Sequence, residues 1–267
     1  MSRQAYYRMR KRNQWIRRVE LVIVDWVRMI RSLMPELGAK KIYERWGEAL
    51  PYGRDKFLDL MRRKQLLIPH KPACAPRTTY ASSRPGLANL FMNLVLWRAG
   101  QAVVSDITYV RLQRGHCYLS LVTDAFSKKI VGWYVAATLE AAGSIAALKR
   151  AIATYGSTAG LLHHSDRGIQ YLCMDYGKQL KRAGMRQSVT MDDHCAENAL
   201  AECINGILKR EFGLGGRFHS IHQVRRVVSE AIYIYNHYRP NRAMGHRTPD
   251  EVHYNKTITT LNFCQPI

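Results

Sequence analysis

Short apolar runs of two different periods alternate along the chain between residues 102 and 237. Runs rich in β-branched and aromatic residues, bounded by turn residues, predict five strands. These lie at residues 102–110, 117–123, 130–137, 160–165 and 186–189. Apolar residues that recur every three or four positions predict helices at residues 140–154, 170–183, 197–209 and 221–237. Three strands followed by alternating helices and strands predict an α/β domain, a mixed five-stranded sheet flanked by helices.

Residues 1–64 are predicted to be wholly helical. One helix is expected to begin near Val19 and to end at Pro35, and Gly38 and the turn at residues 51–53 separate two shorter helices. Short basic helices joined by tight turns suggest a helix-turn-helix-like DNA-binding domain. The candidate groove helix, residues 55–64, would offer DNA the side chains of Lys56, Arg62, Arg63 and Lys64. The alternative is a small helical bundle with a solvated charged face.

Prolines divide this helical region from the α/β pattern. Residues 65–97 hold four prolines up to Pro85, with Ser and Thr and without periodicity, which predicts a linker. We therefore expect a basic helical domain at residues 1–64, the linker at 65–97, the α/β core at 98–252 and a C-terminal tail at 253–267.

The charge of the chain points to a polyanionic partner. Its 267 residues include 41 Lys and Arg against 20 Asp and Glu, a net charge of +21. Residues 1–64 alone hold 17 basic and 7 acidic residues. A merely soluble basic surface is the alternative, but solubility needs a net charge of only about 2 to 8. Nucleic acid is therefore the expected partner.

Cysteine spacing and hydropathy exclude several classes of protein. The six cysteines include no CxxC pair, which argues against a zinc site and a disulfide framework and predicts reduced side chains in a cytoplasmic protein. No segment is apolar and long enough to span a membrane. The basic run at residues 8–12 has no apolar segment behind it, so it is not a secretory signal.

Three carboxylates, Asp106, Asp166 and Glu202, suggest a site for divalent metal ions. Asp106 lies within a run that predicts a buried strand, where a carboxylate is costly unless a cation compensates it. Asp166 ends the fourth predicted strand, and Glu202 lies on the helix at 197–209. Two strands and a helix can bring the three acids to within a few ångströms of one point.

Each acid has a purely structural alternative. Asp106 could be a surface residue at a strand end, Asp166 a turn former before Gly168, and Glu202 an exposed helix residue. For a fourth acid, Asp124, the interpretation as a structural turn former is the favoured one.

Several segments in a fixed order carry a family resemblance. The four main ones are SDITYV at 105–110, LVTDAFSKKIVGW at 121–133, HSDRGIQY at 164–171 and ENALAE at 197–202. Asp166 and Glu202 enclose 35 residues, Lys209 follows Glu202 by seven positions, and YNHYRP at 235–240 and TP at 248–249 follow. With these motifs the chain resembles the integrase-like catalytic core of bacterial insertion-sequence transposases, in particular the OrfB product of the insertion-sequence-three family. The order of elements matches their ribonuclease H-like fold.

The resemblance implies a DDE transposase that cleaves DNA at element ends and transfers strands. Asp106 would bridge two Mg²⁺ ions, for which Mn²⁺ can substitute, while Asp166 and Glu202 would each hold one ion. Lys209, on the helix face of Glu202, would contact DNA phosphate near the scissile bond. His164 and Asn198 would orient metal-bound groups or contact the DNA.

The chain departs from the family pattern at three places. Val103 stands where the family usually has Trp, Glu197 replaces an Asp, and the loop at 191–194 lacks the usual glycine. None of these departures removes an expected metal ligand.

The resemblance also implies partners and a location. The expected partners are double-stranded DNA, both terminal inverted repeats and target, and further copies of the chain on paired ends, with an upstream-frame protein as an additional candidate. The expected location is the nucleoid of a bacterial cytoplasm. Two alternatives are a DNA-binding regulator with a silent core and a non-specific RNase H-like nuclease.

Overall fold

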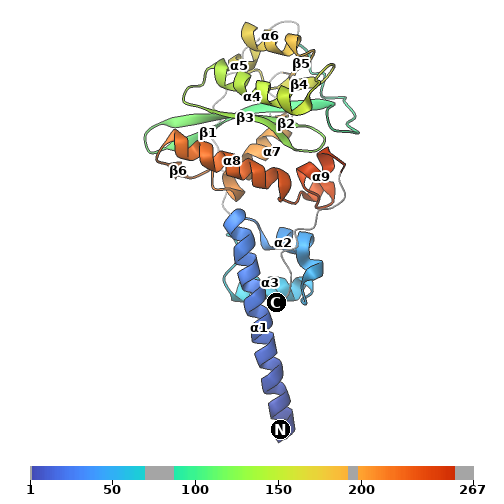
Figure 1. The fold of residues 1–267 in the computed structure, drawn as a ribbon, viewed down its shortest axis with the longest axis vertical. Coiled ribbons are helices and arrows are strands. Elements are labelled where there is room, and N and C mark those ends of the chain that lie inside the picture. The colour runs from blue at the N-terminus through green and yellow to red at the C-terminus, as the bar shows by residue number, and fades with distance from the viewer. Residues whose placement is uncertain (1, 70–86, 192–197, 256–267) are drawn as a thin grey trace. The chain divides into compact units, whose positions relative to one another are not determined.

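The computed structural model describes residues 2–69, 87–191 and 198–255, which belong to two compact units (Figure 1). The first unit includes the described residues up to 69, and the second includes those from residue 87 onward. Each unit is described separately.

The first unit is all-helical, as the sequence predicts. Its elements are α1 (Arg3–Leu33), α2 (Ala39–Trp46), the 3₁₀ turn η1 (Gly47–Ala49) and α3 (Arg54–Arg63). Gly38 and Gly53 stand at the N-caps of α2 and α3, where the expected boundaries lie. Trp26 of α1 packs edge to face on Trp46 of α2, with ring centroids 6.2 Å apart. Tight packing of these apolar faces makes the unit a folded body rather than isolated helices, which are marginal alone.

The start of α1 differs from the prediction. The helix begins at Arg3 rather than near Val19, with Ser2 as N-cap accepting a hydrogen bond from the backbone N–H of Ala5 at 3.3 Å. Its buried residues begin only at Ile23, so the earlier turns rest on helix propensity and capping and not on an apolar face. No helix in the described part of the chain is long and apolar enough to cross a membrane.

The second unit contains the predicted mixed sheet. Five strands stand in the order β3-β2-β1-β4-β5. They are β1 (Ala102–Leu112), β2 (His116–Asp124), β3 (Ile130–Ala136), β4 (Leu162–Ser165) and β5 (Arg186–Val189). The first three form the expected antiparallel meander, and β4 and β5 run parallel to β1. A sixth strand, β6 (Arg217–Phe218), pairs with the end of β1. It was not predicted because two residues are too short to carry a hydrophobic period.

Helices flank this sheet on both faces (Figure 1). They are α4 (Ala141–Tyr155), α5 (Ile169–Leu172), α6 (Met174–Arg182), α7 (Ala199–Glu211), α8 (Ile221–His237), η3 (Arg242–Met244) and α9 (Pro249–His253). Val103 of β1 belongs to the apolar core shared with α4 and α6, whereas Val104 belongs to the core shared with Ala201 of α7. The expected helix at 170–183 is two helices, because Cys173 has extended backbone angles.

The second half of the expected linker belongs to the core. The backbone N–H of Leu90 donates to Ser188 Oγ at 2.9 Å, and Phe91 stacks on His164 with ring centroids 4.9 Å apart. The core therefore begins before the expected boundary at residue 98. Residues 70–86 of that linker, residues 192–197 with the departures at 192–194 and Glu197, and the tail from 256 onward lie outside the described residues.

The motif at residues 235–240 holds the core together. The side-chain amide of Asn236 pairs with both the N–H and the C=O of Ile130, at 3.0 and 2.9 Å. Arg239 makes a buried bidentate ion pair with Glu211 of α7, at 2.7 and 2.9 Å. Thr248 caps α9 in a capping box with Glu251. These polar side chains thus fasten α8 and the residue that follows its C-cap to β3 and to α7, and they cap α9.

Candidate functional site

Asp106 and Asp166 are placed next to each other by strand register. Strands β1 and β4 are parallel, and Ser105 is the Cα partner of Ser165. The two aspartates are the next residues on each path, and neighbouring strands lie about 4.8 Å apart. Side chains alternate along a strand, so Asp106 shares the face of Val104, which α7 covers. The charge of Asp166 acts on Asp106, so the two carboxylates lie near each other at this end of the sheet.

Helix α7 presents one polar stripe to this place. Asn198, Glu202, Asn205 and Lys209 follow one another at intervals of four, three and four residues, which keeps them on one side of a helix. The amide of Asn205 donates to Asp106 Oδ2 at 2.6 Å, and that of Asn198 donates to the carbonyl of Ser105 at 3.2 Å. Glu202 lies between these two contacts on the same stripe, and its side chain is exposed. The third acid is thus on the side of α7 that faces β1.

Electrostatics link the three acids. Burial, then the charge of Asp166, and to a smaller degree that of Glu202, raise the pKa of Asp106 to about 7. Hydrogen bonds from the Ile107 N–H and from Asn205 only partly oppose this rise. Burial also raises the pKa of Asp166, against a hydrogen bond from the Gly168 N–H at 3.0 Å, so this side chain does form the turn considered above. The hydrogen-bond donors around these acids are too few to compensate their negative charge.

The carboxylates do not form a closed cage. Among the residues that the structure describes, no three His, Cys, Asp or Glu side chains gather closely enough to hold a metal ion as they stand. The expected convergence to a few ångströms is therefore not present. Mutual repulsion accounts for such an opening, since like charges without a cation between them favour separation.

The donor set nevertheless suits a hard divalent cation. Mg²⁺ binds few carboxylates and keeps several waters, so it does not need a closed protein cage. Asn198 and Asn205 are 4% and 5% exposed, and the Oδ1 atom of each is buried without a hydrogen-bond partner. The amide group of Asn205 turns its N–H to Asp106, which leaves this oxygen unsatisfied, and an unsatisfied buried oxygen is costly unless an ion or water meets it.

Sequence reasoning missed Asn205. The signal was available, because Asn205 stands three residues after Glu202 and four before Lys209 on an otherwise apolar-periodic helix. A polar residue at that spacing shares the face of both.

His164 has no surface to offer to DNA. Its ring is fully buried, it pairs with Ser188 Oγ at 2.9 Å, and it stacks on Phe91. Asn198 is similarly enclosed. Of the two roles considered for these residues, only orientation of neighbouring groups fits their burial. Lys209 is half-buried, and its pKa is lowered by burial while the nearby Asp106 opposes this shift.

The four candidate groove residues of the first unit are exposed at or near α3. The Lys56 ammonium lies 3.9 Å from the Tyr52 ring centroid, and Arg62 approaches Asp59 at 3.6 Å. Arg63 pairs with Asp59 at 3.0 Å and with Glu20 of α1 at 2.9 Å, so part of its charge serves to tie α3 to α1. Lys64 is the C-cap of the helix.

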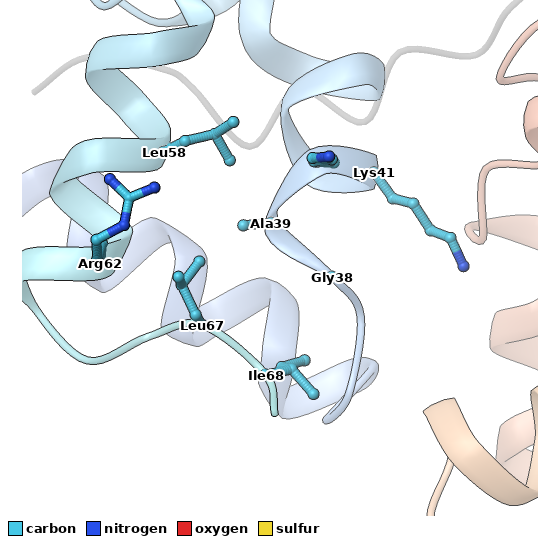
Figure 2. A pocket seen from close by; sticks show the side chains of 8 residues that line it. Gly38, Ala39, Lys41, Leu58, Arg62, Leu67 and Ile68 are labelled. Atoms are coloured by element: carbon cyan, nitrogen blue, oxygen red, sulfur yellow. The ribbon is translucent and has the colours of Figure 1, made fainter. Parts of the chain in front are cut away.

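A shallow pocket opens between the start of α2 and the end of α3. It is lined by Gly38, Ala39, Lys40, Lys41, Leu58, Arg62, Leu67 and Ile68. Figure 2 shows the Lys41 side chain extending away from this pocket, whose labelled walls are mostly apolar. Its lining includes no carboxylate, so it is separate from the acidic site.

Comparison with known proteins agrees with this fold. Residues 98–195 and 183–249 match two family profiles that are both described as Integrase core domain. The uncharacterized 31 kDa protein of insertion element IS600 from Shigella sonnei is 31% identical over 199 residues, which cover 74% of this chain and 73% of that protein. The chain belongs to the insertion-sequence-three family of transposases with an integrase core.

Two further relatives of this family member are matched over a shorter length. A putative transposase for IS986/IS6110 from Mycobacterium tuberculosis is 35% identical over 155 residues, 56% of each chain. Transposase InsF for insertion sequence IS3A from Escherichia coli is 33% identical over 152 residues, 57% of this chain and 53% of that one. The match thus spans about half the length of these relatives.

Solved structures confirm the ribonuclease H-like integrase fold. A chain in the simian T-cell lymphotropic virus intasome, solved in complex with a PP2A regulatory subunit, has a TM-score of 0.50 at 15% identity and covers 90% of this chain and 78% of that one. At that identity the likeness concerns the fold alone.

Proposed function

We propose that this protein is a metal-dependent transposase that cuts DNA at the ends of its insertion element and joins the freed 3′ ends to a second site. The observation that carries the proposal is the parallel register that sets Asp106 beside Asp166, under the α7 stripe that bears Glu202. Family membership and the integrase core support the same activity.

Each residue of the site has a chemical task in this proposal. Two Mg²⁺ ions, or Mn²⁺ in their place, would supply activation of the attacking oxygen and stabilisation of the leaving one. Asp106, Asp166 and Glu202 would hold the ions. Asn205 keeps Asp106 oriented through its 2.6 Å hydrogen bond. Lys209 would bind a phosphate near the scissile bond, and the buried His164 and Asn198 would hold β4 and β1 in place.

DNA is the partner in this proposal, as the net charge of +21 favours. Terminal repeats would be recognised by the first unit through α3, and paired ends would require more than one copy of the chain. The relatives named above do not support an upstream-frame protein, and none is proposed. The protein would act at the bacterial nucleoid, in the cytoplasm, where its DNA lies.

A strand-transfer assay tests this proposal. The purified full chain is incubated with Mg²⁺ and a labelled duplex that carries the element end. We expect cleavage at the end and joining to a second duplex, and both are lost in Glu202→Gln. Cys203→Ala, at the neighbouring exposed position on α7, is the matched control and keeps both steps. Binding without cleavage would favour the regulator, cleavage without joining the nuclease, and joining by Glu202→Gln would refute the proposed site.

A further inference from the structure

Two arginines stand side by side at the end of β1, where β6 pairs with it, without a compensating charge. Arg111 near the end of β1 is the Cα partner of Arg217 in β6, in a parallel pair. Both side chains are exposed, and among the residues that the structure describes neither makes an ion pair. Like charges at facing positions of neighbouring strands, about 4.8 Å apart, destabilise a sheet. The fold therefore carries a local repulsion that no internal contact explains.

This arginine pair is connected to Lys209 of the candidate active site. The Gly215 N–H donates to the carbonyl of Lys209 at 3.0 Å, and the short segment that follows leads directly into Arg217. Burial lowers the pKa of Lys209, the charge of Asp106 raises it and that of Arg111 lowers it. Lys209 thus lies within electrostatic reach of both Asp106 and Arg111.

A third arginine extends the positive charge to the tip of the β1–β2 hairpin. Arg114 is exposed in the turn, and it too has no ion-pair partner within the described part of the chain. The Gln113 N–H donates to the carbonyl of Phe218 at 2.8 Å, which fastens this turn to β6. Figure 1 shows β6 alongside the end of β1, away from the centre of the sheet.

We propose that Arg114, Arg111 and Arg217, together with Lys209, form a phosphate-binding track for double-stranded DNA at the hairpin end of β1. This inference rests on the proposed function, and it assigns to the core a DNA surface separate from the helical first unit. Duplex DNA carries one negative charge per ~1.7 Å of its axis, so adjacent phosphates can meet adjacent arginines. Contacts of arginine and lysine to phosphate oxygens position the duplex and carry no sequence information. The track therefore binds element-end DNA and unrelated DNA equally.

Salt-dependent binding of the full chain tests the track. The double variant Arg111→Gln/Arg217→Gln is compared with Lys181→Gln/Arg182→Gln, which removes the same charge from exposed positions on α6. Fluorescence anisotropy is measured with an element-end duplex and with an unrelated duplex. Losing two phosphate contacts should lower the slope of log K against log salt by about 1.8 and weaken binding of both duplexes about tenfold or more. Equal behaviour of the two double variants would overturn the proposal, and loss confined to the element end would assign the arginines to recognition of the repeat instead.

A charge reversal separates the track from a structural role. Arg217→Glu places an acid opposite Arg111, so it should raise the melting temperature by relieving the repulsion and should weaken DNA binding further. A lower melting temperature together with unchanged binding would assign the pair to the fold. If the wild-type chain neither binds nor joins DNA, the proposed function fails. If the wild type joins strands but the Arg111→Gln/Arg217→Gln variant binds DNA as well as the control variant does, only the track is refuted.

Discussion

Asp106 and Asp124 lie on neighbouring strands of one sheet, yet their surroundings differ completely. Asp124 is fully buried and accepts hydrogen bonds from five donors. These are Gly100 N, Phe126 N, Ser127 N, Ser127 Oγ and Tyr155 Oη, at 2.7–3.1 Å. Among the described residues, Asp106 accepts only from the Ile107 N–H and from Asn205, and burial together with two other carboxylates raises its pKa. Hydrogen-bond donors of the protein compensate the charge of Asp124 but not that of Asp106.

This difference separates structural from functional acids better than burial does. A carboxylate surrounded by N–H and O–H donors needs no further partner. Asp124 is such a residue, and it closes the β2–β3 turn as the sequence predicts. A half-buried carboxylate with few donors and like-charged neighbours destabilises the fold. Carboxylates whose pKa values are perturbed in this way cluster at functional sites. The comparison is sharpened by giving both residues the same substitution.

Asp106→Asn should have the largest effect on activity. The amide keeps the shape of the carboxylate but removes the charge that would bind the metal ions, whose contribution is worth several kcal/mol. We expect strand transfer to fall by about a thousandfold or more, equivalent to about 4 kcal/mol. Circular dichroism and the melting temperature should show an intact fold. Substantial joining by this variant would end the distinction drawn between the two aspartates.

Asp124→Asn should have the opposite profile. Whichever way the new amide turns, its NH₂ group meets an N–H donor, that of Gly100 or those of Phe126 and Ser127, so charge-assisted hydrogen bonds are replaced by a repulsive contact. We expect the free energy of unfolding to fall by about 3 kcal/mol, measured by urea denaturation. Activity per folded molecule, assayed well below the melting temperature, should remain close to that of the wild type. A stability equal to that of the wild type would show that the five donors do not stabilise the turn.

The sequence predicted the sheet well because its strands carry their own signal. The β5 range of 186–189 and the α8 range of 221–237 agree with the structure residue for residue. Features that depend on partners distant in the chain were missed. The two-residue β6 exists only through β1, and residues 88–96 look like linker until Ser188 and His164 are seen beneath them.

The candidate site was predictable in its residues but not in its geometry. Family spacing singled out the three acids and Lys209, and helical spacing alone could have added Asn205. What sequence cannot express is the register between β1 and β4 or the number of donors around each carboxylate. Asp106 and Asp124 both end or interrupt similar β-branched runs, and only the contacts in space tell them apart.

The pH dependence of stability measures the uncompensated charge of Asp106 directly. Its pKa of about 7 in the fold lies above the ordinary 3.8, so folding favours the protonated acid. This stabilisation is fully present below about pH 4 and is lost as the pH rises through 7. Between pH 5 and pH 8, in EDTA, we expect the free energy of unfolding of the wild type to fall by on the order of 2 kcal/mol. Asp106→Asn should remove this decline, and an identical slope in both proteins would contradict the assigned pKa.

Asn205→Ala should produce the smallest effect, a loss of metal affinity alone. Its amide orients Asp106 through the 2.6 Å hydrogen bond and leaves an unsatisfied oxygen beside the acid. Partners that orient metal ligands typically contribute about 10- to 100-fold to metal affinity, so we expect Mg²⁺ binding measured by calorimetry to weaken about tenfold. Asn205→Asp adds a fourth carboxylate, which separates charge from orientation, and Cys203→Ala serves as the neutral control on the same helix.

Substitutions around Asp124 should not change Mg²⁺ affinity, because Asp124 already has its donors. Tyr155→Phe removes one of the five donors and should lower stability while leaving Mg²⁺ affinity unchanged. Equal Mg²⁺ affinities in wild type and Asn205→Ala would place Asn205 with the structural contacts, on the Asp124 side of the comparison.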